Sequence, residues 1–371
     1  MAKVCQLSSV HAAFDVRIFH KECRTLARAG YEVVLIIPHD RHQQVDGVKI
    51  HALAPARNRW RRLSGLIWRM YGAALAEQAQ IYHFHDPELI PLGLLLKLHR
   101  KKVIYDVHED YAGSLLTNAR KDIAARFRKT ASKMVRLFEL AGARCFDGLV
   151  TATPFIAGNF SKFTPALVQN YPLIGELAAA SGPTYPQRAN QICYVGGLSA
   201  LRGVREMVQA AGLLSPDYGS RLYLAGEFTD RQFLEELRQS PAWGKVNHLG
   251  LLSRAGVAAL LAQARVGLVL FHPGPNNTNS QPNKLFEYMS AGLPVIASDF
   301  PRWREIIAKI QCGLVVDPLQ PEAIAAAITW MFDHPGEAEA MGQRGQRAVA
   351  EIFNWDQEAR KLLDLYQKVL R

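Results

Sequence analysis

The chain has 371 residues, of which 49% are hydrophobic and 21% charged, and its formal net charge is +11. This composition excludes a disordered chain, and the length suits two hydrophobic cores better than one. No apolar run reaches the roughly 18 residues that a membrane-spanning helix needs. Five cysteines, at positions 5, 23, 145, 193 and 312, lack any paired spacing. This pattern indicates reduced thiols in a cytoplasmic protein, and neither disulfides nor a zinc site.

The positive charge is concentrated in the first half of the sequence. Residues 1–180 hold 25 Lys and Arg against 15 Asp and Glu, whereas residues 181–371 hold 19 against 18. A basic surface suits an anionic partner such as a membrane, a lipid phosphate or a nucleic acid. It also keeps a protein soluble without any partner, so the charge alone leaves both interpretations open.

The first half alternates between strand-like and helix-like patterns. The run Tyr31–Ile37 is nearly all apolar and is closed by Pro38, as expected of a strand buried on both faces of a sheet. Helices are expected at residues 17–29 and in the basic stretch 123–145. The alternation predicts a parallel, doubly wound sheet. Its expected strands are residues 3–8, 31–37, 81–85, 102–106 and 148–151.

The same alternation restarts after residue 190, and a segment rich in Pro and Gly separates the two halves. We therefore predict an α/β fold of two Rossmann-like, doubly wound domains, whose ligands bind at the carboxyl ends of the strands. Strands of the second domain are expected at residues 191–195, 221–225, 246–249, 266–271, 294–297 and 313–316. The predicted boundaries are 1–172 for the first domain, 173–190 for a linker, 191–352 for the second domain and 353–371 for a final helix.

Residues 279–298 carry the most informative pattern of the second half. Pro282 is a typical first-turn residue and Gly292 a typical helix stop, so one short helix is expected between them. Free backbone N–H groups at its start suit a diphosphate, and Lys284 adds a positive charge there. Glu287 lies on the same face and can accept hydrogen bonds from both hydroxyls of a ribose. The alternative is an ordinary capped helix with a Lys284–Glu287 surface pair.

The stretch from Pro282 to Ser298 resembles the donor-binding segment of glycosyltransferase family 4 (glycosyl transferases group 1), retaining enzymes of the GT-B fold. Residues 194–208 resemble the phosphate-side loop that opens the second domain of that family, and residues 222–226 and 246–250 resemble its next strands. The resemblance implies a GT-B architecture in which the final helix crosses back to the first domain. It also implies metal-independent transfer of a sugar from a nucleotide diphosphate, with UDP-sugar first and GDP-sugar next.

In the family, the last glutamate of the donor segment holds the ribose, and Glu287 occupies that position. Asn279 stands where the family often has an acidic residue, and Gly197 stands where it usually has Arg. Arg202 replaces the usual lysine, and Lys284 is expected to compensate for the missing cation. The implied donor-binding residues are Gly196, Gly197, Arg202, Gly250, Asn279, Ser280, Gln281, Pro282, Asn283, Lys284, Leu285 and Glu287.

In the first half, residues 105–111 lie where the family keeps a histidine that faces the donor sugar and phosphate. We assign this role to His108, and we predict that His108, Arg202 and Lys284 are the catalytic residues. An ordinary loop histidine is the alternative. Nearby, residues 83–88 contain His83, His85 and Asp86, which are metal-ligand types. Because no compact fourth ligand is visible and the family uses no metal, we predict no metal site.

The acceptor is expected to bind in the first domain. His11, Asp15 and Arg17 in the first loop are predicted to face it, together with His85, although a helix N-cap is the safer interpretation of Asp15. The basic clusters at residues 58–62 and 97–102 are predicted to touch anionic lipid, where each charge is worth about 1 kcal/mol. We therefore expect a cytoplasmic enzyme, peripheral at the inner face of the membrane. A glycan or lipid-linked acceptor in surface polysaccharide synthesis is expected, with no cofactor and no nucleic acid.

Other functions fit parts of the sequence. A nucleotide-sugar epimerase of the same fold would bind the nucleotide without needing an acceptor. A donor-binding protein without transfer activity would explain Asn279 and Gly197. A nicotinamide dehydrogenase needs a Gly-x-Gly-x-x-Gly turn, which Gly196, Gly197 and Gly203 do not supply. A nucleic-acid-binding module would explain the charge but leaves residues 279–298 unexplained.

Overall fold

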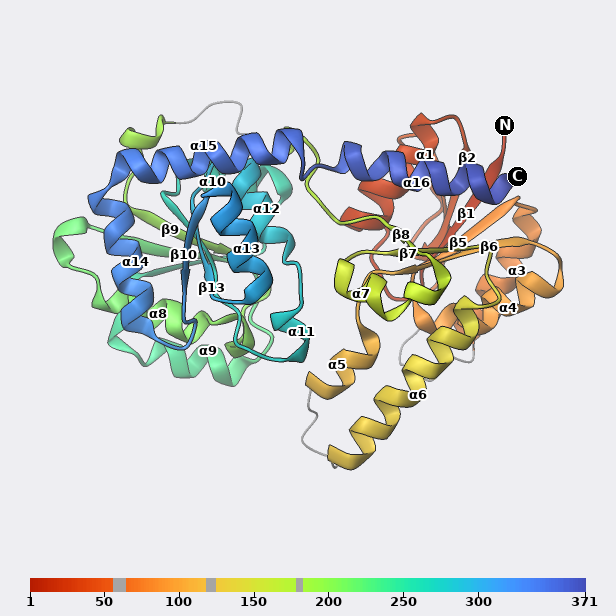
Figure 1. Ribbon diagram of the computed structural model, residues 1–371, viewed down its shortest axis with the longest axis horizontal. Coiled ribbons are helices and arrows are strands. Elements are labelled where there is room, and N and C mark those ends of the chain that lie inside the picture. Colours follow the sequence, from red (N-terminus) through yellow and green to blue (C-terminus); the bar gives the residue numbers. More distant parts are fainter. Residues whose placement is uncertain (56–64, 118–124, 178–182) are drawn as a thin grey trace. The chain divides into compact units, whose positions relative to one another are not determined.

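The computed structural model describes residues 1–55, 65–117, 125–177 and 183–371 (Figure 1). The chain divides into two compact units. The first unit comprises Met1–Asn170 together with Trp355–Arg371, and the second unit comprises Tyr171–Asn354. Among the described residues, no helix combines the length and apolar character that crossing a bilayer requires. The basic cluster predicted at residues 58–62 lies outside the described residues.

The sheet of the first unit has eight strands in the order β3-β4-β2-β1-β5-β6-β7-β8. Its pairs are parallel except for β3 with β4. The inner strands follow the Rossmann order, which reverses between β1 and β5 and places a crevice at their carboxyl ends. The bounds are β1 Lys3–Leu7, β2 Glu32–Pro38, β3 Gln43–Val45, β4 Val48–Leu53, β5 Ile81–Phe84, β6 Lys102–Val107, β7 Gly148–Thr151 and β8 Ala166–Leu167.

The short β3–β4 hairpin was not predicted from the sequence. Its turn is Asp46-Gly47, with φ angles of 50° and 80°. Two positive φ angles define the type I′ turn that suits a two-residue hairpin, and Asp-Gly is a preferred sequence for it. The dipeptide was therefore a usable signal, although the strands beside it are too short for a clear alternating pattern.

The predicted helix at residues 17–29 is two elements, a π-helix (η1, Val16–Cys23) and α1 (Arg24–Arg28). Asp15 caps η1, because its side chain accepts hydrogen bonds from the N–H groups of Arg17 and Ile18. Residues five apart are joined by a hydrogen bond in a π-helix, so Arg17 and Glu22 lie one turn apart on the same side. Both are buried. The wider turn of the π-helix therefore places two polar side chains on the same buried side of the helix.

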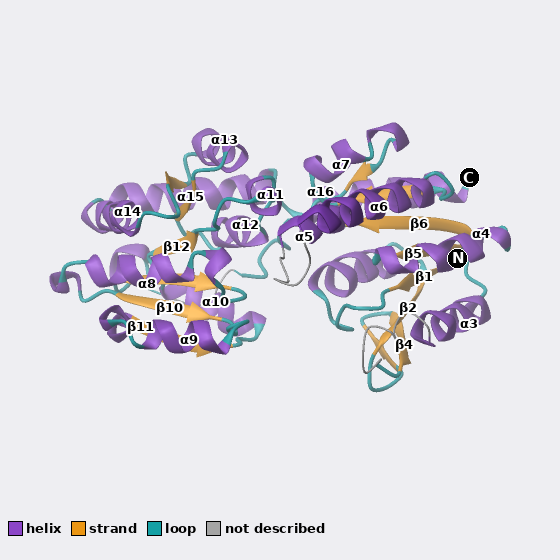
Figure 2. Ribbon diagram, turned by 90° about the horizontal axis from the view of Figure 1, so that it is seen from below, coloured by secondary structure: helices purple, strands orange, loops and turns teal. Residues whose placement is uncertain are grey.

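The other helices of the first unit flank its sheet (Figure 2). The predicted basic helix is present as α6. The final helix, α16, belongs to this unit as expected, and it buries Trp355, Leu362, Tyr366 and Val369 there. These helices are α3 Ile67–Glu77, η3 Pro87–Leu89, α4 Ile90–Leu98, α5 Tyr111–Thr117, α6 Ala125–Ala143, α7 Pro154–Asn159, η4 Ser161–Phe163 and α16 Trp355–Leu370.

The second unit has six parallel strands in the order β11-β10-β9-β12-β13-β14, again the Rossmann order, with its reversal between β9 and β12. All six were predicted. Their bounds are β9 Gln191–Val195, β10 Arg221–Ala225, β11 Val246–Gly250, β12 Val266–Val269, β13 Val295–Ser298 and β14 Gly313–Val316. Two Rossmann-like units with a returning final helix confirm the predicted fold class.

Helices also flank the second sheet in Figures 1 and 2. They enclose a continuous apolar core that includes Tyr171 and Tyr185 from the segment after the first unit. The helical elements are η5 Tyr185–Gln187, η6 Ala200–Arg202, α8 Val204–Leu213, η7 Pro216–Tyr218, α9 Arg231–Arg238, η8 Pro241–Lys245, α10 Arg254–Gln263, α11 Pro275–Thr278, α12 Asn283–Ser290, α13 Pro301–Ile310, α14 Pro321–Asp333 and α15 Pro335–Glu351.

Candidate active site

The topological switch of the first unit gathers three polar side chains from separate loops. His11 follows β1, Asp86 follows β5 and His108 follows β6. His11 Nδ1 lies 3.3 Å from Asp86 Oδ1, and His11 Nε2 lies 3.2 Å from His108 Nε2. Asp86 is fixed in turn by the backbone N–H of Ser9, which donates to it at 2.6 Å. The strand order thus brings Asp86, His11 and His108 together as a chain of interacting side chains, although they are far apart in the sequence.

The two histidines of this chain have opposite protonation tendencies. Burial disfavours the charged form of His11, but its hydrogen bond to Asp86 outweighs burial and raises its pKa. Burial also disfavours ionised Asp86, yet His11 and the Ser9 amide hold the pKa of Asp86 at about 2. Burial lowers the pKa of His108 to about 4, an effect that Asp106 only partly offsets. The raised pKa of His11 and the lowered pKa of His108 make His11 the proton donor and His108 the acceptor of their shared hydrogen bond.

A buried ion pair lies beneath this chain. The Arg17 guanidinium donates two hydrogen bonds to Asp106, at 2.8 and 3.1 Å, and a third to the carbonyl of Val168 at 3.0 Å. Burial would raise the pKa of Asp106, but the charge of Arg17 dominates and holds it well below its ordinary value. Glu22 lies beside the pair, and its burial raises its pKa well above the usual range despite Arg17. Burial therefore opposes ionisation of Glu22, although the Arg17 guanidinium lies 3.0 Å away.

The histidines of β5 complete the network. His85 Nδ1 lies 3.2 Å from Asp106 Oδ2, and His85 Nε2 lies 2.6 Å from the side-chain oxygen of Gln6. The Gln6 amide and the Tyr366 hydroxyl lie 3.2 and 2.7 Å from His83 Nδ1. Burial lowers the pKa of His83 well below its ordinary value, so this ring is a neutral acceptor. Tyr366 belongs to α16, and the final helix therefore reaches into the network.

The prediction that His83 and His85 lack a compact fourth ligand is wrong. Glu22, His83, His85 and Asp106 offer ligand atoms that all lie within 4.8 Å of one another. The guanidinium of Arg17 lies 3.0 Å from Glu22 and 2.8 Å from Asp106, so its charge would oppose a metal cation among these residues. The set therefore suits a hydrogen-bonded network better than a metal site. Sequence reasoning missed Glu22 and Asp106 because they are far from the histidines along the chain.

The remaining acceptor-side candidates differ in exposure. Arg17 is 4% exposed and His85 is fully buried, so both lie below the surface of the unit. Asp15 caps η1, in agreement with the alternative given for it. His11 retains 20% of its side-chain exposure and His108 retains 10%. Of these residues, His11 and His108 are therefore the two that a ligand can reach.

In the second unit, glycines shape the turns at the carboxyl ends of β9 and β10. Gly196 and Gly226 have φ angles of 132° and 148°. A Cβ on Gly226 would lie 2.0 Å from the carbonyl oxygen of Gly196, and a Cβ on Gly196 would lie 3.1 Å from Lys284 Nζ. Both positions therefore need glycine, because side chains would strain the backbone and displace the lysine. Gly197 directly follows Gly196 in the first of these turns, and Gly250 ends the neighbouring strand β11.

Two cations among the predicted donor-binding residues lie near the same aromatic ring. Arg202 lies 3.9 Å above the Phe271 ring, and Lys284 Nζ lies 5.0 Å from the same ring and 5.1 Å from Tyr194. Burial, together with the adjacent charge of Arg202, lowers the pKa of Lys284 to about 8 against the attraction of Glu287. Like charges held this close are relieved by an anion. The arrangement is therefore a site prepared for negative charge.

The segment before Lys284 leads into the start of α12, where the backbone N–H groups have no side-chain cap. Pro282 is the N-cap and provides no side-chain cap, so the first N–H groups of the helix are left for other acceptors. Trp303 donates to the carbonyl of Ser280 at 2.8 Å, and Arg302 donates to the Gln281 side chain at 3.1 Å. The α13 side chains thus fix the backbone that leads into α12. Asn279, Asn283 and Leu285 occupy neighbouring positions of the same segment.

Glu287 pairs with Arg254, which sequence reasoning missed. Arg254 donates to Glu287 at 2.9 Å and to both carboxylate oxygens of Glu176 at 2.9 and 2.8 Å. Glu287 therefore forms its ion pair with Arg254 at the start of α10, and the Lys284–Glu287 surface pair of the alternative interpretation is not formed between these two described residues. A guanidinium that is itself held by a second carboxylate fixes the direction of the Glu287 carboxylate.

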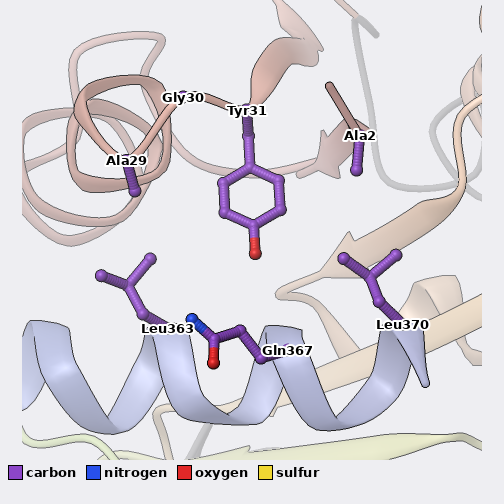
Figure 3. A pocket seen from close by; sticks show the side chains of 7 residues that line it. All are labelled: Ala2, Ala29, Gly30, Tyr31, Leu363, Gln367 and Leu370. Carbon is purple, nitrogen blue, oxygen red and sulfur yellow. The ribbon is translucent and has the colours of Figure 1, made fainter.

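A hollow of about 310 Å³ also occurs in the first unit, lined by Ala2, Ala29, Gly30, Tyr31, Leu363, Gln367 and Leu370 (Figure 3). Ala2 and Tyr31 immediately precede β1 and β2, so the hollow lies at the amino ends of the strands. Parallel α/β sheets bind ligands at the opposite, carboxyl ends. We therefore do not assign this hollow to the active site.

Comparisons with known proteins agree with this geometry. Residues 189–334 match the family model for glycosyl transferases group 1, and residues 16–165 match the glycosyl transferase 4-like domain. The chain is 22% identical over 341 residues to glycogen synthase of Mycobacterium tuberculosis, covering 90% of this chain and 79% of that protein.

Solved structures show the same fold along the whole chain. Sucrose-phosphate synthase of Thermosynechococcus elongatus has a TM-score of 0.76 at 16% identity, covering 100% of this chain and 99% of that one. Anabaena HepE in complex with UDP-glucose has a TM-score of 0.74 at 12% identity, covering 99% and 100%. The chain therefore belongs to the glycosyl transferases group 1 family, with a GT-B fold, and it is a glycosyltransferase of the hexosyltransferase type.

Proposed function

We propose that this enzyme transfers a sugar from a nucleoside diphosphate to a glycan acceptor, with UDP as the first candidate nucleotide and GDP as the second. The observation that carries the proposal is the pair of cations, Arg202 and Lys284, held over Phe271 beside the open start of α12. A diphosphate is an anion that suits two neighbouring cations and the N–H groups at the start of a helix. The structural relative HepE is described in complex with UDP-glucose, which supports UDP as the first choice.

In this proposal, Glu287 accepts hydrogen bonds from the ribose hydroxyls, and Arg254 and Glu176 keep its carboxylate in place. The backbone from Ser280 to Leu285, with Gly196, Gly197 and Gly250, surrounds the diphosphate and the sugar. Asn279 contributes a neutral hydrogen bond to the sugar where relatives often have an acid. Each of these contacts comes from residues of the second unit, so donor binding is testable independently of the acceptor.

Departure of the diphosphate leaves positive charge on the sugar and adds negative charge to the phosphate. Arg202, Lys284 and the N–H groups of α12 stabilise the departing phosphate, and we expect this electrostatic stabilisation to provide most of the rate acceleration. This supply of positive charge makes the proposed transfer metal-independent. The proposed stereochemistry is retention, in which the acceptor attacks the face that the phosphate leaves and the phosphate takes the acceptor proton.

His108 is proposed to contact the donor sugar and phosphate from the first unit. Its neutral ring accepts a hydrogen bond from protonated His11, which Asp86 holds at 3.3 Å. The tautomer that this bond requires carries its proton on Nδ1 of His108, a buried atom that lies 4.0 Å from Asp106 Oδ2. Asp15, Arg17 and His85 are proposed to act on the acceptor site by positioning other residues. Asp15 caps the helix that follows the His11 loop. Arg17 and His85 contact Asp106, on the strand that leads to His108.

The acceptor is proposed to be a glycan or a lipid-linked glycan of surface polysaccharide synthesis, and the enzyme is proposed to be peripheral to the cytoplasmic membrane. The support is the charge distribution. The first unit has 29 Lys and Arg against 17 Asp and Glu, whereas the second unit has 15 against 16. A net charge of +12 on one unit favours contact with anionic lipid.

Thermal unfolding with UDP, GDP, ADP, CMP and dTDP tests the donor site. A nucleotide present at a hundred times its Kd stabilises the protein by about 2.7 kcal/mol. One nucleotide is expected to raise the unfolding midpoint, and Glu287→Ala is expected to abolish this rise. Glu305→Ala is the matched control, since it removes an exposed carboxylate from α13 of the same unit. If no nucleotide changes the midpoint, the proposed donor site is wrong.

The transfer reaction has a separate test. The nucleotide identified by unfolding is supplied as its sugar conjugates, and the products are separated by mass spectrometry with and without glycan acceptors. Transfer is expected only with an acceptor. A donor sugar that changes configuration while still bound to nucleotide, without any acceptor, would instead show an epimerase.

A further inference from the structure

Helix α6 of the first unit has one face fixed by neighbouring elements. Glu139 is buried and accepts a hydrogen bond from Tyr105 at 3.1 Å, and Ser132 donates to the carbonyl of Ala112 at 2.7 Å. A Cβ on Gly142 would lie 2.7 Å from Ile90, so the missing side chain allows α6 to lie close to α4. The helix therefore cannot rotate freely, and the same residues always face outward.

The outward face carries large apolar side chains. The exposed fractions are 58% for Phe127, 65% for Met134, 66% for Leu137 and 43% for Phe138. Successive residues of an α-helix are separated by about 100°. Phe127, Met134 and Phe138 therefore follow one line along the helix, and Leu137 lies beside it. We call these four residues the α6 stripe. A contiguous exposed apolar stripe of this kind marks an interaction surface.

Basic residues border the α6 stripe along one side. Lys129, Lys133 and Arg144 are exposed, and the same helical spacing places them next to the edge that Leu137 forms. With the described carboxylates they form no ion pair, and Glu139, the acidic residue of α6, is buried on the opposite face. The cluster predicted at residues 97–102 differs, because Lys97 and Lys102 both lie near Asp147, at 2.6 and 3.8 Å.

We infer that the α6 stripe and its basic border bind the surface of a bilayer that contains anionic lipid. The apolar side chains enter the boundary between headgroups and acyl chains, and the cations contact the lipid phosphates. This inference rests on the membrane association proposed above and names the surface responsible for it. A second copy of the chain fits the surface less well, because the two basic borders would meet and each first unit has a net charge of +12.

Co-sedimentation with vesicles of phosphatidylcholine containing phosphatidylglycerol tests the surface. One basic residue near anionic lipid is worth about fivefold in partition constant, so Lys129→Gln with Lys133→Gln is expected to weaken binding about 25-fold. Met134→Ser with Leu137→Ser is expected to weaken it about tenfold or more through lost apolar burial. Vesicles of phosphatidylcholine alone are expected to bind the native protein weakly.

Matched control variants come from the second unit. Leu251→Ser with Leu319→Ser removes two exposed leucines, and Lys309→Gln with Arg347→Gln removes two exposed charges. Both controls are expected to bind vesicles as the native protein does. If the controls and the α6 variants bind equally well, the α6 surface is the wrong one, although the proposed membrane association survives. If the native protein does not bind anionic vesicles, both proposals fail, and the nucleotide test remains independent.

Cys145 provides a local readout. It is exposed and lies in the turn that follows the end of α6 at Ala143. The other cysteines are buried, so a polarity-sensitive fluorophore can be attached at Cys145 alone. Anionic vesicles are expected to shift its emission to the blue, and high salt is expected to reverse the shift. Vesicle binding without any shift would overturn the inference, as would concentration-dependent dimerisation in the absence of lipid that the Met134 and Leu137 substitutions abolish.

Discussion

The two units share one strand order but form their carboxyl-end sites in different ways. The site of the second unit uses backbone shape and local sequence, with tight glycine turns, a short helix and two cations over Phe271. The site of the first unit depends on buried side chains that are distant in sequence, such as Arg17 and Asp106, which are 89 residues apart. The same topology therefore supports either a cationic site built from local sequence or a site above a buried ion pair.

This difference leads to different sensitivities. A substitution in the buried network of the first unit leaves a charge without its partner, so stability should suffer first. A substitution among the donor residues of the second unit leaves the fold intact, so binding and rate should suffer first. The following predictions test this contrast, from the largest expected effect to the smallest.

Asp106→Asn is expected to lower the free energy of unfolding by about 3–5 kcal/mol, because the buried Arg17 guanidinium keeps only Glu22, whose burial opposes its ionisation. The matched control is Asp299→Asn, which breaks the exposed pair between Asp299 and Arg304 and should cost about 0.2–1 kcal/mol. Urea unfolding of both variants measures the difference. Equal losses in the two variants would show that burial of the ion pair does not set its importance.

Lys284→Ala is expected to reduce kcat/KM about 100- to 1000-fold, since it removes positive charge from the departing phosphate. Its unfolding free energy should change little or rise, because the lysine is held beside another cation and burial lowers its pKa to about 8. Steady-state kinetics and urea unfolding of the same preparation separate these effects. A large loss of stability with normal kinetics would reverse the proposed contrast between the units.

The Asp86–His11 pair is expected to make the first unit sensitive to pH. The pKa of Asp86 is depressed to about 2, so its stabilisation is present above its unfolded pKa near 4 and is lost as the pH falls through about 2. The pKa of His11 is raised, so its stabilisation is full below about 6.5 and is lost as the pH rises past its folded pKa. Stability from this pair is therefore greatest between about pH 4 and 6.5.

Asp86→Asn tests the acid side of that window. The variant should lose about 2 kcal/mol of unfolding free energy near pH 5, and the difference from the native protein should shrink below pH 3. Urea unfolding at a series of pH values measures it. Nitrogen NMR of the histidine rings should show His108 neutral down to about pH 4 in the native protein. A difference between native and variant that stays constant with pH would contradict this account.

Glu176→Gln is expected to have the smallest effect. It weakens the bidentate partner of Arg254 but leaves the Arg254–Glu287 hydrogen bond of 2.9 Å, and the residues are partly exposed, so about 0.2–1 kcal/mol is expected. This loss should appear as a rise of about 1.4- to fivefold in KM for the donor at constant kcat. Donor titrations measure it. A selective fall in kcat would place Arg254 in the reaction itself.

Much of the fold followed from sequence patterns, because buried parallel strands are continuous apolar runs that need no knowledge of distant residues. The helix from Pro282 to Gly292 was predictable for the same reason, since its cap, charge and stop are neighbours in the sequence. The buried network was not, because Glu22 and Asp106 acquire meaning only when strand order brings them to His83 and His85. Arg254 was missed similarly, as an ordinary basic residue at a helix start. The β3–β4 hairpin had an available signal in Asp46-Gly47.

The insertion of α16 into the first unit has a consequence for synthesis of the protein on the ribosome. Trp355 donates to Thr25 at 2.8 Å, and Tyr366 lies 2.7 Å from His83, so the interior of the first unit includes residues that are translated after the whole second unit. Residues 171–354 leave the ribosome before α16 does. The second unit can therefore fold during translation, whereas the unit that is translated first must wait for α16 to complete its histidine network.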